Sequence, residues 1–392
     1  MKKSILFVIN NLNCGGAEKA LISLLETLDY SKVNVDLYLF KQEGMFLSKV
    51  PIEVNILDEP KLYDIFNMPI KKALFTALRS GRLSLAINRL LAGYVFKYEK
   101  NGAKCEQRVW KYKKKSLDKI PKDYDLAVGY LEKGPIYFCV DMVNAKTKVG
   151  FIHNDYVELG MKPKYDQEYF RELDWIYTVS NECANVLEQT FPHYKQKINV
   201  MHNIISTKVL HRLAKEELKF NLEGIKICSI GRLNAQKGFD LAIGACKRLV
   251  DEGINIKWYV LGEGEEREKL EKLINENNLW NHFFLLGLKE NPYPYVKTAD
   301  IYVQSSRFEG KSIAIDEAKI LHKPIVVTNF STSRDQIDHE KNGLIVGMGE
   351  KEIAEGIKRL IEDKKLKDSL VQNLLEQDLG TETEINKLYS II

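Results

Sequence analysis

Short apolar runs alternate with longer amphipathic runs along most of this chain. Residues 4–10 and 33–40 read as strands, and between them residues 17–28 place leucines at helical spacing. Strands that alternate with helices form parallel sheets, because each helix carries the chain back to the edge where the strand began. The sequence therefore predicts an α/β fold. Further strand-like runs lie at residues 52–57, 124–131, 148–154, 176–180, 197–202, 225–230, 258–261, 283–286, 301–303, 324–328 and 344–346, and residues 350–376 read as one long helix.

With 392 residues, the chain is too long for one ordinary hydrophobic core, so two domains are expected. A charge-rich stretch without a strand-like run, residues 204–223, is typical of a link between them. We therefore expect an N-terminal domain at 1–203 with a basic amphipathic insertion at 61–122, a linker at 204–223, a C-terminal domain at 224–375 and a tail at 376–392.

Positive charge is concentrated in one segment. The whole chain carries a net charge of +4, but residues 61–122 contain 16 Lys and Arg against 4 Asp and Glu, a net of +12, which leaves −8 elsewhere. Within the segment, residues 68–78 and 83–98 read as helices that mix apolar, aromatic and basic side chains, and Lys113–Lys115 follow. Such helices suit an anionic bilayer surface. A solvated cover on the first domain is the alternative, and no nucleic-acid-binding motif accompanies the charge.

The cysteines and the apolar runs indicate the compartment. The six cysteines form no C-x-x-C pair, so reduced thiols are expected rather than disulfides or a zinc site. The apolar run at residues 5–9 is too short for the core of a signal peptide and reads as the first strand. Nowhere do about 18 apolar residues follow one another, so we expect no membrane-spanning helix and a cytoplasmic protein.

Polar residues gather where the strand-like run 301–303 gives way to a helical run at 313–320. In open α/β sheets this is where ligands bind. Gly310 permits a tight turn, and the unbonded N–H groups of the following helix start are expected to form an anion site. Glu309 and Glu317 flank it, and a carboxylate can accept two hydrogen bonds from a vicinal diol. The pair therefore suits an extended ligand with a phosphate between two diols. Alternatively, Glu309 caps the helix and Glu317 is a solvated surface charge.

Other strand-to-helix connections carry glycines or cations. Gly15 and Gly16 open the first helix, where a backbone without side chains can approach a phosphate; a plain tight turn is the alternative. Arg232 and Lys237 lie in a glycine-bounded loop that suits an anion, or else in an ordinary exposed loop. A third loop of this kind contains Gly262 and Gly264.

Two further positions carry side chains that could take part in chemistry. His153 ends a strand-like run and so lies at a strand's carboxyl mouth, although a lone histidine is more often structural. Asp123 and Asp125 form a D-x-D that precedes its strand rather than following it. We interpret it as a turn and expect no metal site there.

Taken together, Gly-Arg-x4-Lys-Gly at 231–238, Gly-x-Gly at 262–264, the two glutamates at 309 and 317, and the glycine pair at 15–16 resemble the retaining nucleotide-sugar glycosyltransferases of family 4. That family has the GT-B fold, in which two Rossmann-like domains face each other across a cleft, with the acceptor on the N-terminal side. The resemblance covers nearly the whole chain and is strongest over 225–347, while 61–122 is matched only loosely.

The resemblance implies a role for each candidate residue. Arg232 and Lys237 would hold the donor diphosphate, and His153 would contact the donor sugar near the reacting carbon. Glu317 would bind the ribose hydroxyls and Glu309 a hydroxyl of the transferred sugar, which would place Glu309, His153, Arg232 and Lys237 at the chemistry. The remaining donor-binding positions would be Gly15, Gly16, Gly262, Gly264, Gly310, Lys311 and Ser312. The family usually has an apolar residue and a proline where this chain has Lys311 and Ser312.

The implied reaction moves a hexose or N-acetylhexosamine from a nucleoside-diphosphate sugar, with UDP favoured, to a lipid-linked saccharide, with retention of anomeric configuration. Such a step belongs to bacterial capsule, exopolysaccharide or lipopolysaccharide synthesis at the inner face of the cell membrane. Neither metal nor cofactor is expected, since cations and helix N-termini can stabilise the departing diphosphate. The alternatives are a sugar-nucleotide epimerase or a phosphorylase on the same fold, or a catalytically silent, membrane-associated scaffold that binds nucleotides.

Overall fold

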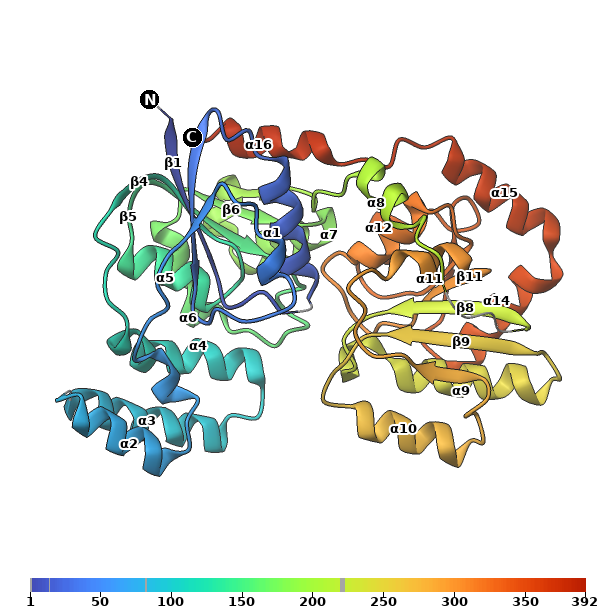
Figure 1. Ribbon diagram of the computed structural model, residues 1–392, viewed down its shortest axis with the longest axis horizontal. Helices are drawn as coiled ribbons and strands as arrows, with labels where there is room; N and C mark the ends of the chain where they lie inside the picture. The colour runs from blue at the N-terminus through green and yellow to red at the C-terminus, as the bar shows by residue number, and fades with distance from the viewer. Residues whose placement is uncertain (1, 14, 82, 219–222) are drawn as a thin grey trace. The chain divides into compact units, whose positions relative to one another are not determined.

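The computed structural model describes residues 2–13, 15–81, 83–218 and 223–392. The chain divides into two compact units (Figure 1). The first comprises residues 1–13, 17–202 and 384–392, and the second comprises residues 14–16 and 203–383. Independent folding of the predicted domains 1–203 and 224–375 stays a prediction.

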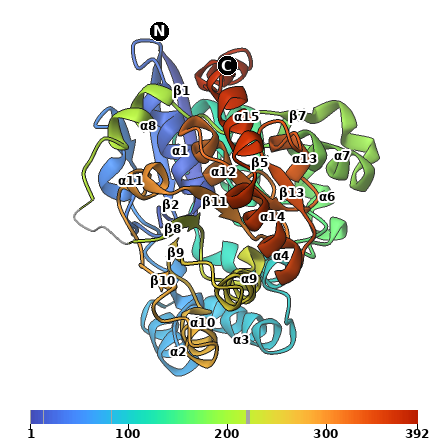
Figure 2. The ribbon, with the colours of Figure 1, turned by 90° about the vertical axis from the view of Figure 1, so that its right-hand side faces the viewer.

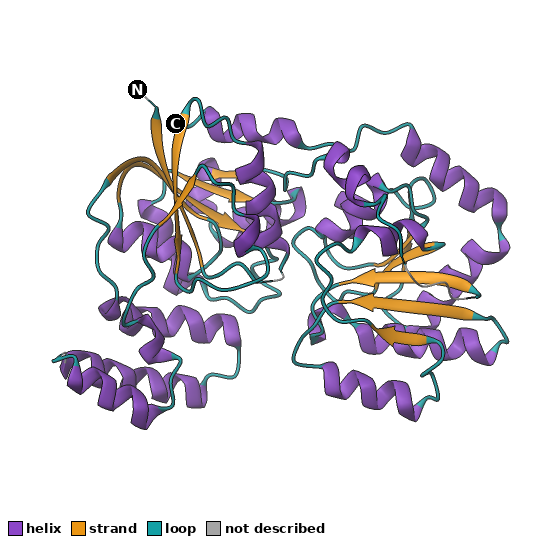
Figure 3. Cartoon of the chain, viewed as in Figure 1, coloured by secondary structure: helices purple, strands orange, loops and turns teal. Residues whose placement is uncertain are grey.

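The first unit is built on a seven-stranded parallel sheet with the order β3-β2-β1-β4-β5-β6-β7. Its central strands β1 and β4 begin with polar residues and are apolar and buried over their carboxyl-terminal halves because helices cover both faces, which is typical of parallel sheets (Figure 3). The order reverses between β1 and β4, which are neighbours although β2, β3 and several helices come between them in the chain. The strands are β1 Lys3–Ile9, β2 Val33–Leu39, β3 Val54–Ile56, β4 Asp123–Gly129, β5 Asn144–Ile152, β6 Trp175–Thr178 and β7 Ile198–Val200. The helices beside them are α1 Gly16–Thr27, α5 Gly134–Met142, α6 Pro163–Glu172 and α7 Asn181–Thr190.

The predicted insertion 61–122 contains three helices that lie together in the first unit (Figure 1). They are α2 Ile70–Arg79, α3 Leu83–Tyr98 and α4 Gly102–Lys113. The inward sides of these helices enclose a small core of their own, formed by Ile65, Phe66, Ala73, Ala77, Leu85, Ala86, Ala92, Val95, Cys105 and Val109.

The second unit is built on a six-stranded parallel sheet with the order β10-β9-β8-β11-β12-β13. Helices α9 and α14 pack side by side and share one apolar core with the strands (Figure 2). The strands are β8 Ile225–Ile230, β9 Ile256–Leu261, β10 Phe283–Leu285, β11 Ile301–Gln304, β12 Ile325–Thr328 and β13 Leu344–Val346. The helices are α8 Thr207–Leu213, α9 Phe239–Asp251, α10 Arg267–Glu276, α11 Tyr293–Thr298, α12 Ile313–Ile320, α13 Ser333–Gln336, α14 Glu350–Glu362 and α15 Lys364–Leu375, and α16 Ile385–Tyr389 follows in the first unit.

Two expectations about local structure are wrong. Residues 350–376 form two helices rather than one, because the side chain of Asp363 accepts a hydrogen bond from the Leu366 N–H and starts α15 as its N-cap. Asp123 and Asp125 lie inside β4 rather than in a turn. The Asp125 carboxylate accepts from the backbone N–H of Ser4 in the neighbouring strand β1, so it links two central strands of the sheet.

The described cysteines, at 105, 139, 183, 228 and 246, are buried and form no disulfide, and Cys14 lies outside the described residues. Within the described ranges, each helix is too short or too polar to cross a bilayer.

Candidate active site

The candidate site of the second unit lies where its strand order reverses. From β8 the chain moves outward to β9 and β10, whereas from β11 it moves to β12 and β13 on the other side, and β8 and β11 are paired neighbours. The connections that follow these two parallel strands therefore emerge side by side, which is the usual position of a ligand in an open α/β sheet. The first connection contains Arg232 and Lys237, and the second contains Glu309 and Gly310.

The two connections are joined by backbone contacts. The Arg307 N–H donates to the Gln236 carbonyl at 2.7 Å, and the Ser305 hydroxyl donates to the Lys237 carbonyl at 2.9 Å. Gly238 has φ 63°, and a Cβ there would lie 2.1 Å from the Ser305 carbonyl oxygen. Glycine is thus required at 238 both by its backbone conformation and by the close approach of the second loop.

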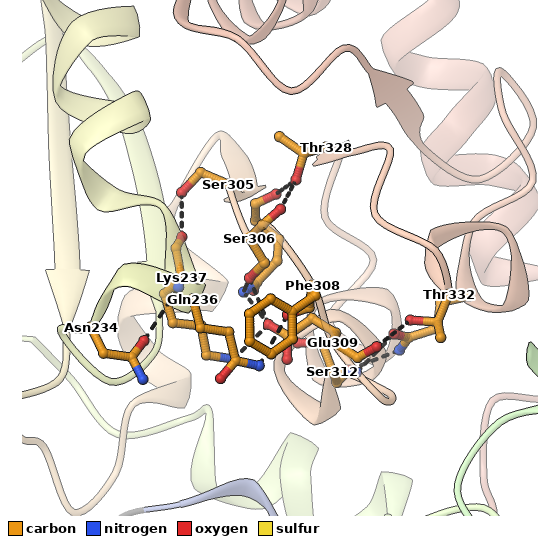
Figure 4. A network of polar contacts seen from close by, with 12 residues as sticks. Asn234, Gln236, Lys237, Ser305, Ser306, Phe308, Glu309, Ser312, Thr328 and Thr332 are labelled. Atoms are coloured by element: carbon orange, nitrogen blue, oxygen red, sulfur yellow. Dashed lines mark hydrogen bonds and ion pairs between the residues drawn. The ribbon is translucent and has the colours of Figure 1, made fainter. Parts of the chain in front are cut away.

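Glu309 is the centre of a buried polar network (Figure 4). Its Oε1 accepts from Lys237 Nζ at 2.6 Å, from the Ser306 hydroxyl at 2.6 Å and from Gln304 Nε2 at 3.2 Å. The Tyr302 hydroxyl donates to Gln304 Oε1 at 2.8 Å and so orients the amide. Every hydrogen bond to this carboxylate from the described residues ends on Oε1. Oε2 is consequently the oxygen that remains for a hydroxyl of a ligand.

Lys237 is therefore not a solvent-exposed cation of an ordinary loop. Its side chain is only 18% exposed, and its ammonium group forms an ion pair with Glu309. An ammonium group has three N–H donors, so the remaining donors can still reach an anion while one holds the carboxylate. Arg232, by contrast, lies on the exposed part of the same connection.

Gly262 and Gly264 have a structural explanation. A Cβ at Gly262 would lie 1.9 Å from the Gly231 carbonyl oxygen, and a Cβ at Gly264 would lie 2.3 Å from the Leu233 carbonyl oxygen. These glycines let the connection after β9 press against the connection after β8. Their predicted contact with the donor stays a prediction.

At the start of α12 the backbone N–H of Ser312 is engaged within the protein, and the predicted contact of Ser312 with the donor stays a prediction. The Ser312 N–H is not available to an anion, because it donates to the side-chain oxygen of Gln336 at 2.8 Å, and the Gln336 amide donates back to the Ser312 carbonyl at 2.8 Å. Lys311 pairs with Asp316, 3.5 Å away. The next N–H groups, at Ile313 and Ala314, lie in the first helical turn, where no intrahelical carbonyl is in reach.

Glu317 is buried in α12 and is not the solvated surface charge considered as an alternative. Its Oε1 accepts from the Tyr293 hydroxyl at 2.9 Å. The structure thus brings Lys237 and Glu309 into direct contact, whereas Glu317 belongs to a separate network that reaches α11.

The first unit has its own strand-order reversal, between β1 and β4. Gly15 and Gly16 follow β1, Glu132 follows β4, and His153 follows the adjacent β5. Glu132 is 3% exposed and accepts from the His153 backbone N–H at 3.1 Å and from Asn154 Nδ2 at 3.2 Å. These contacts hold the turn that carries the histidine.

His153 is buried between the rings of Tyr130 and Phe151, with centroid separations of 4.9 and 5.8 Å. Burial lowers the pKa of its imidazole to about 4, against the opposing effects of the Glu132 carboxylate and a hydrogen bond to the Tyr130 backbone. The ring is therefore neutral at physiological pH. Among the residues that the structure describes, none provides a hydrogen-bond partner for its buried Nε2. A polar group of a ligand would satisfy this atom.

Sequence reasoning missed the residues that support the two glutamates. Tyr302 lies in the apolar run 301–303 and Gln304 directly follows it; a polar side chain at the end of a buried strand was the available signal. Ser306 was not singled out by the sequence. Neither Tyr293, in a proline-rich connection, nor Glu132 stood out.

Comparison with known proteins finds similarity over the residues of the second unit's candidate site. Residues 212–377 match the family described as Glycosyl transferases group 1, a range that contains the whole site of the second unit. The N-acetylgalactosamine-N,N'-diacetylbacillosaminyl-diphospho-undecaprenol 4-alpha-N-acetylgalactosaminyltransferase of Campylobacter jejuni is 32% identical over 200 residues, 50% of this chain and 53% of that protein. A lipopolysaccharide core biosynthesis glycosyltransferase of Rhizobium meliloti, LpsE, is 28% identical over 219 residues, 56% of this chain and 61% of that protein.

The chain thus spans between half and about three-fifths of the length of these two relatives. Among solved structures, Anabaena HepE in complex with UDP-glucose superposes with a TM-score of 0.69 at 16% identity and covers 100% of both chains. With the two parallel sheets, this likeness confirms the predicted GT-B fold.

Proposed function

We propose, from the premise that residues 212–377 belong to the group 1 glycosyl transferases and the chain has the GT-B fold, that this protein is a glycosyltransferase. It moves a hexose or N-acetylhexosamine from a nucleoside-diphosphate sugar to a saccharide carried by a lipid. The observation that carries the proposal is the Glu309 carboxylate, which is held through Oε1 by three side chains and keeps Oε2 for a sugar hydroxyl.

The charges around Glu309 suit a departing diphosphate. When the bond between the sugar carbon and the phosphate oxygen breaks, negative charge develops on the diphosphate. The remaining N–H donors of Lys237, the exposed Arg232 and the first N–H groups of α12 supply positive charge at the same switch point. Glu317, fixed by Tyr293, would accept from the ribose hydroxyls. This reaction as proposed uses neither a metal ion nor a cofactor.

Formation of the new glycosidic bond completes the proposed reaction. The acceptor hydroxyl oxygen bonds to the anomeric carbon, and the acceptor proton passes to the phosphate oxygen that leaves. In the retaining course that we propose, attack and departure occur on the same face of the sugar. The neutral His153, with its buried Nε2 lacking a described partner, would hydrogen-bond the donor sugar.

Donor and acceptor are supported by the relatives. The HepE structure contains UDP-glucose, which supports UDP as the nucleotide. The Campylobacter relative is named for an undecaprenyl-diphosphate-linked acceptor and LpsE for lipopolysaccharide core synthesis, which supports a lipid-linked saccharide in bacterial surface polysaccharide assembly. The basic segment 61–122 supports a location at the inner face of the membrane.

The test is incubation with UDP- and GDP-sugars, with and without lipid-linked acceptors, followed by measurement of released nucleoside diphosphate and of glycosylated product. Glu309→Gln keeps the size of the side chain but removes its charge, and we expect it to lower kcat/KM by at least about 100-fold. Glu362→Gln, on the exposed face of α14, is the matched control.

Turnover within a few-fold of the wild type in Glu309→Gln would contradict the proposal. Donor binding without transfer to any acceptor would favour the silent scaffold. An altered sugar nucleotide without transfer would favour the epimerase.

A further inference from the structure

Helix α3 is apolar on two opposite faces. Its inward face, with Leu85, Ala92 and Val95, packs into the small helical core. A second set of apolar side chains recurs at helical spacing along the outward face, and all of its members are exposed. They are Leu83 (63%), Ile87 (53%), Leu90 (49%), Leu91 (47%), Tyr94 (64%) and Tyr98 (59%). An isolated exposed leucine needs no explanation, but six such side chains along one helix face do.

The neighbouring α2 has a similar outward face. Ala73 and Ala77 are buried, whereas Phe75 and Leu78 are 66% and 56% exposed. The exposed positions around them are the basic Lys71, Lys72 and Arg79. Below, "the outer face" means Phe75 and Leu78 of α2 with Leu83, Ile87, Leu90, Leu91, Tyr94 and Tyr98 of α3.

Charge in this part of the chain has one sign. Residues 65–98 contain six Lys and Arg and no Asp or Glu. Arg89 is turned inward, where it donates to the carbonyls of Ile65 at 3.0 Å and Met68 at 2.8 Å and so braces the helix pair. The basic side chains beside the outer face are therefore not neutralised by acidic neighbours in the same segment.

We propose that the outer face docks on a bilayer that contains anionic lipids, with its apolar side chains in the boundary between headgroups and acyl chains and its lysines and arginines at the phosphates. Exposed apolar, aromatic and basic side chains on two neighbouring helices are the composition of interfacial membrane helices. The inference rests on the proposed function, because a lipid-linked acceptor gives such docking its use, but its test requires neither donor nor acceptor.

The basic run Lys113–Lys115 fits this role less well than its sequence suggested. Lys113 lies over the ring of Tyr63, 5.0 Å from its centroid, and burial lowers the pKa of its ammonium group. Lys114 forms an ion pair with Asp141 at 3.3 Å. Two of the three lysines are thus engaged within the protein, and the docking surface moves to α2 and α3.

Other occupants fit the outer face less well. A second copy of this chain would bring the same basic segment against itself, and like charges at close range disfavour association. Nucleic acid would match the charge but would leave the apolar side chains in water. An anionic bilayer matches both.

The experiment is flotation of the full chain with vesicles of phosphatidylcholine alone and of phosphatidylcholine mixed with phosphatidylglycerol. We expect binding to the mixed vesicles. The triple variant Ile87→Ser, Leu91→Ser, Tyr94→Ser should lower the partition coefficient about 100-fold, because each change removes a large apolar side chain from the interface. Lys71→Gln, Lys72→Gln, Arg79→Gln should lower it by a similar factor on mixed vesicles and leave binding to neutral vesicles unchanged.

The matched control is Ile52→Ser, Trp280→Ser, Leu288→Ser, which removes exposed apolar side chains elsewhere and should float like the wild type. Unfolding curves check that all variants are folded. Equal flotation of the wild type and the Ile87, Leu91, Tyr94 variant would overturn the proposal. So would a wild type that does not float but sediments as a dimer that this variant disrupts, since the occupant would then be a second copy. Nucleotide release with a soluble acceptor is measured separately, so that loss of docking and loss of the proposed chemistry are distinguishable.

Discussion

At the scale of single residues, Glu309 is positioned by neighbours that would not touch a substrate. Ser306 and Gln304 donate to the carboxylate oxygen that also holds Lys237, and they fix which oxygen is left over. These two side chains therefore set the orientation of the Glu309 carboxylate and do not act through charge alone.

We predict that Ser306→Ala lowers kcat for transfer about tenfold and leaves KM for the donor nearly unchanged. The change removes one donor from a buried acceptor, a loss of about 1–2 kcal/mol in the orientation of Glu309. Steady-state kinetics measure the split, with Ser390→Ala, a partly exposed serine of the first unit, as control. A rise in KM at constant kcat would instead assign Ser306 to donor binding.

His153 gives the protein a pH dependence of stability whose sign follows from its burial. The imidazole pKa is about 4 in the folded state and near 6.5 in the unfolded state, so the unfolded chain binds more protons between these values. The contribution of His153 to stability is therefore present above pH ~6.5 and is lost as the pH falls toward ~4, by ~3 kcal/mol in total.

Asp166 acts in the opposite direction. Burial raises the pKa of its carboxyl to about 6, although Tyr137, Tyr156 and Gln107 donate to it. The pH dependence of wild-type stability thus contains both effects. The difference in stability between the wild type and His153→Gln isolates the contribution of the histidine. We expect the variant's urea midpoint to fall less steeply than that of the wild type between pH 6.5 and 4. If the urea midpoints of the wild type and the variant changed in parallel with pH, folding would not shift the pKa of His153.

At the scale of elements, the periodic parts of the fold were predictable, and the contacts between distant connections were not. Helix α3 has the predicted bounds of 83–98 because its apolar residues repeat at helical spacing. The sequence did not reveal that the helix is interrupted at Asp363, because the helical pattern continues on both sides of this single capping residue.

The candidate site shows the same division. The pairing of β8 with β11 places Lys237 and Glu309 on adjacent connections, although the sequence had not predicted the strand order. That Lys237 pairs with Glu309, and that Gln336 occupies the Ser312 N–H from 24 positions away, depends on side-chain packing that leaves no local pattern. The sequence predicted that Lys237 and Glu309 lie on strand-to-helix connections, and it missed the hydrogen bonds between those connections; the role of the site stays a prediction.

Gly238 and Gly253 form a matched pair that tests how tightly the two site loops are joined. Both have positive φ, at 63° and 80°, but a Cβ at Gly238 would meet the Ser305 carbonyl oxygen at 2.1 Å, whereas a Cβ at Gly253 would meet nothing within 4 Å. We predict that Gly253→Ala costs about 1 kcal/mol of stability and leaves UDP binding unchanged.

Gly238→Ala has the same backbone strain and must also push the two connections apart. We therefore expect a larger loss of stability, by about 2–3 kcal/mol in total, together with at least about tenfold weaker UDP binding. Chemical unfolding and isothermal titration with UDP measure the two effects. Equal UDP affinity in both variants would show that the junction of the loops does not shape the donor site.

At the scale of the whole molecule, the chain ends in the unit in which it began. After the second unit, residues 384–392 return to the first, where Leu388 is fully buried and Ile385 nearly so. Lys387 donates to the Val200 carbonyl at 2.9 Å, and the Asp29 N–H donates to the Tyr389 hydroxyl at 2.6 Å. The last helix thus ties the end of β7 to the turn before β2.

Truncation after Thr383 should consequently destabilise the first unit and not the second. Loss of two buried aliphatic side chains and these hydrogen bonds, less the entropy of ordering the segment, amounts to roughly 2–4 kcal/mol. Hydrogen exchange localises the effect: protection should fall in Val33–Leu39 and Ile198–Val200 and stay unchanged in Ile225–Ile230. Leu388→Ala should give a smaller change of the same pattern, with Ser390→Ala as the control. Equal loss of protection in both sheets would mean that the two units unfold together, and the terminal helix would then stabilise the molecule as one cooperative body.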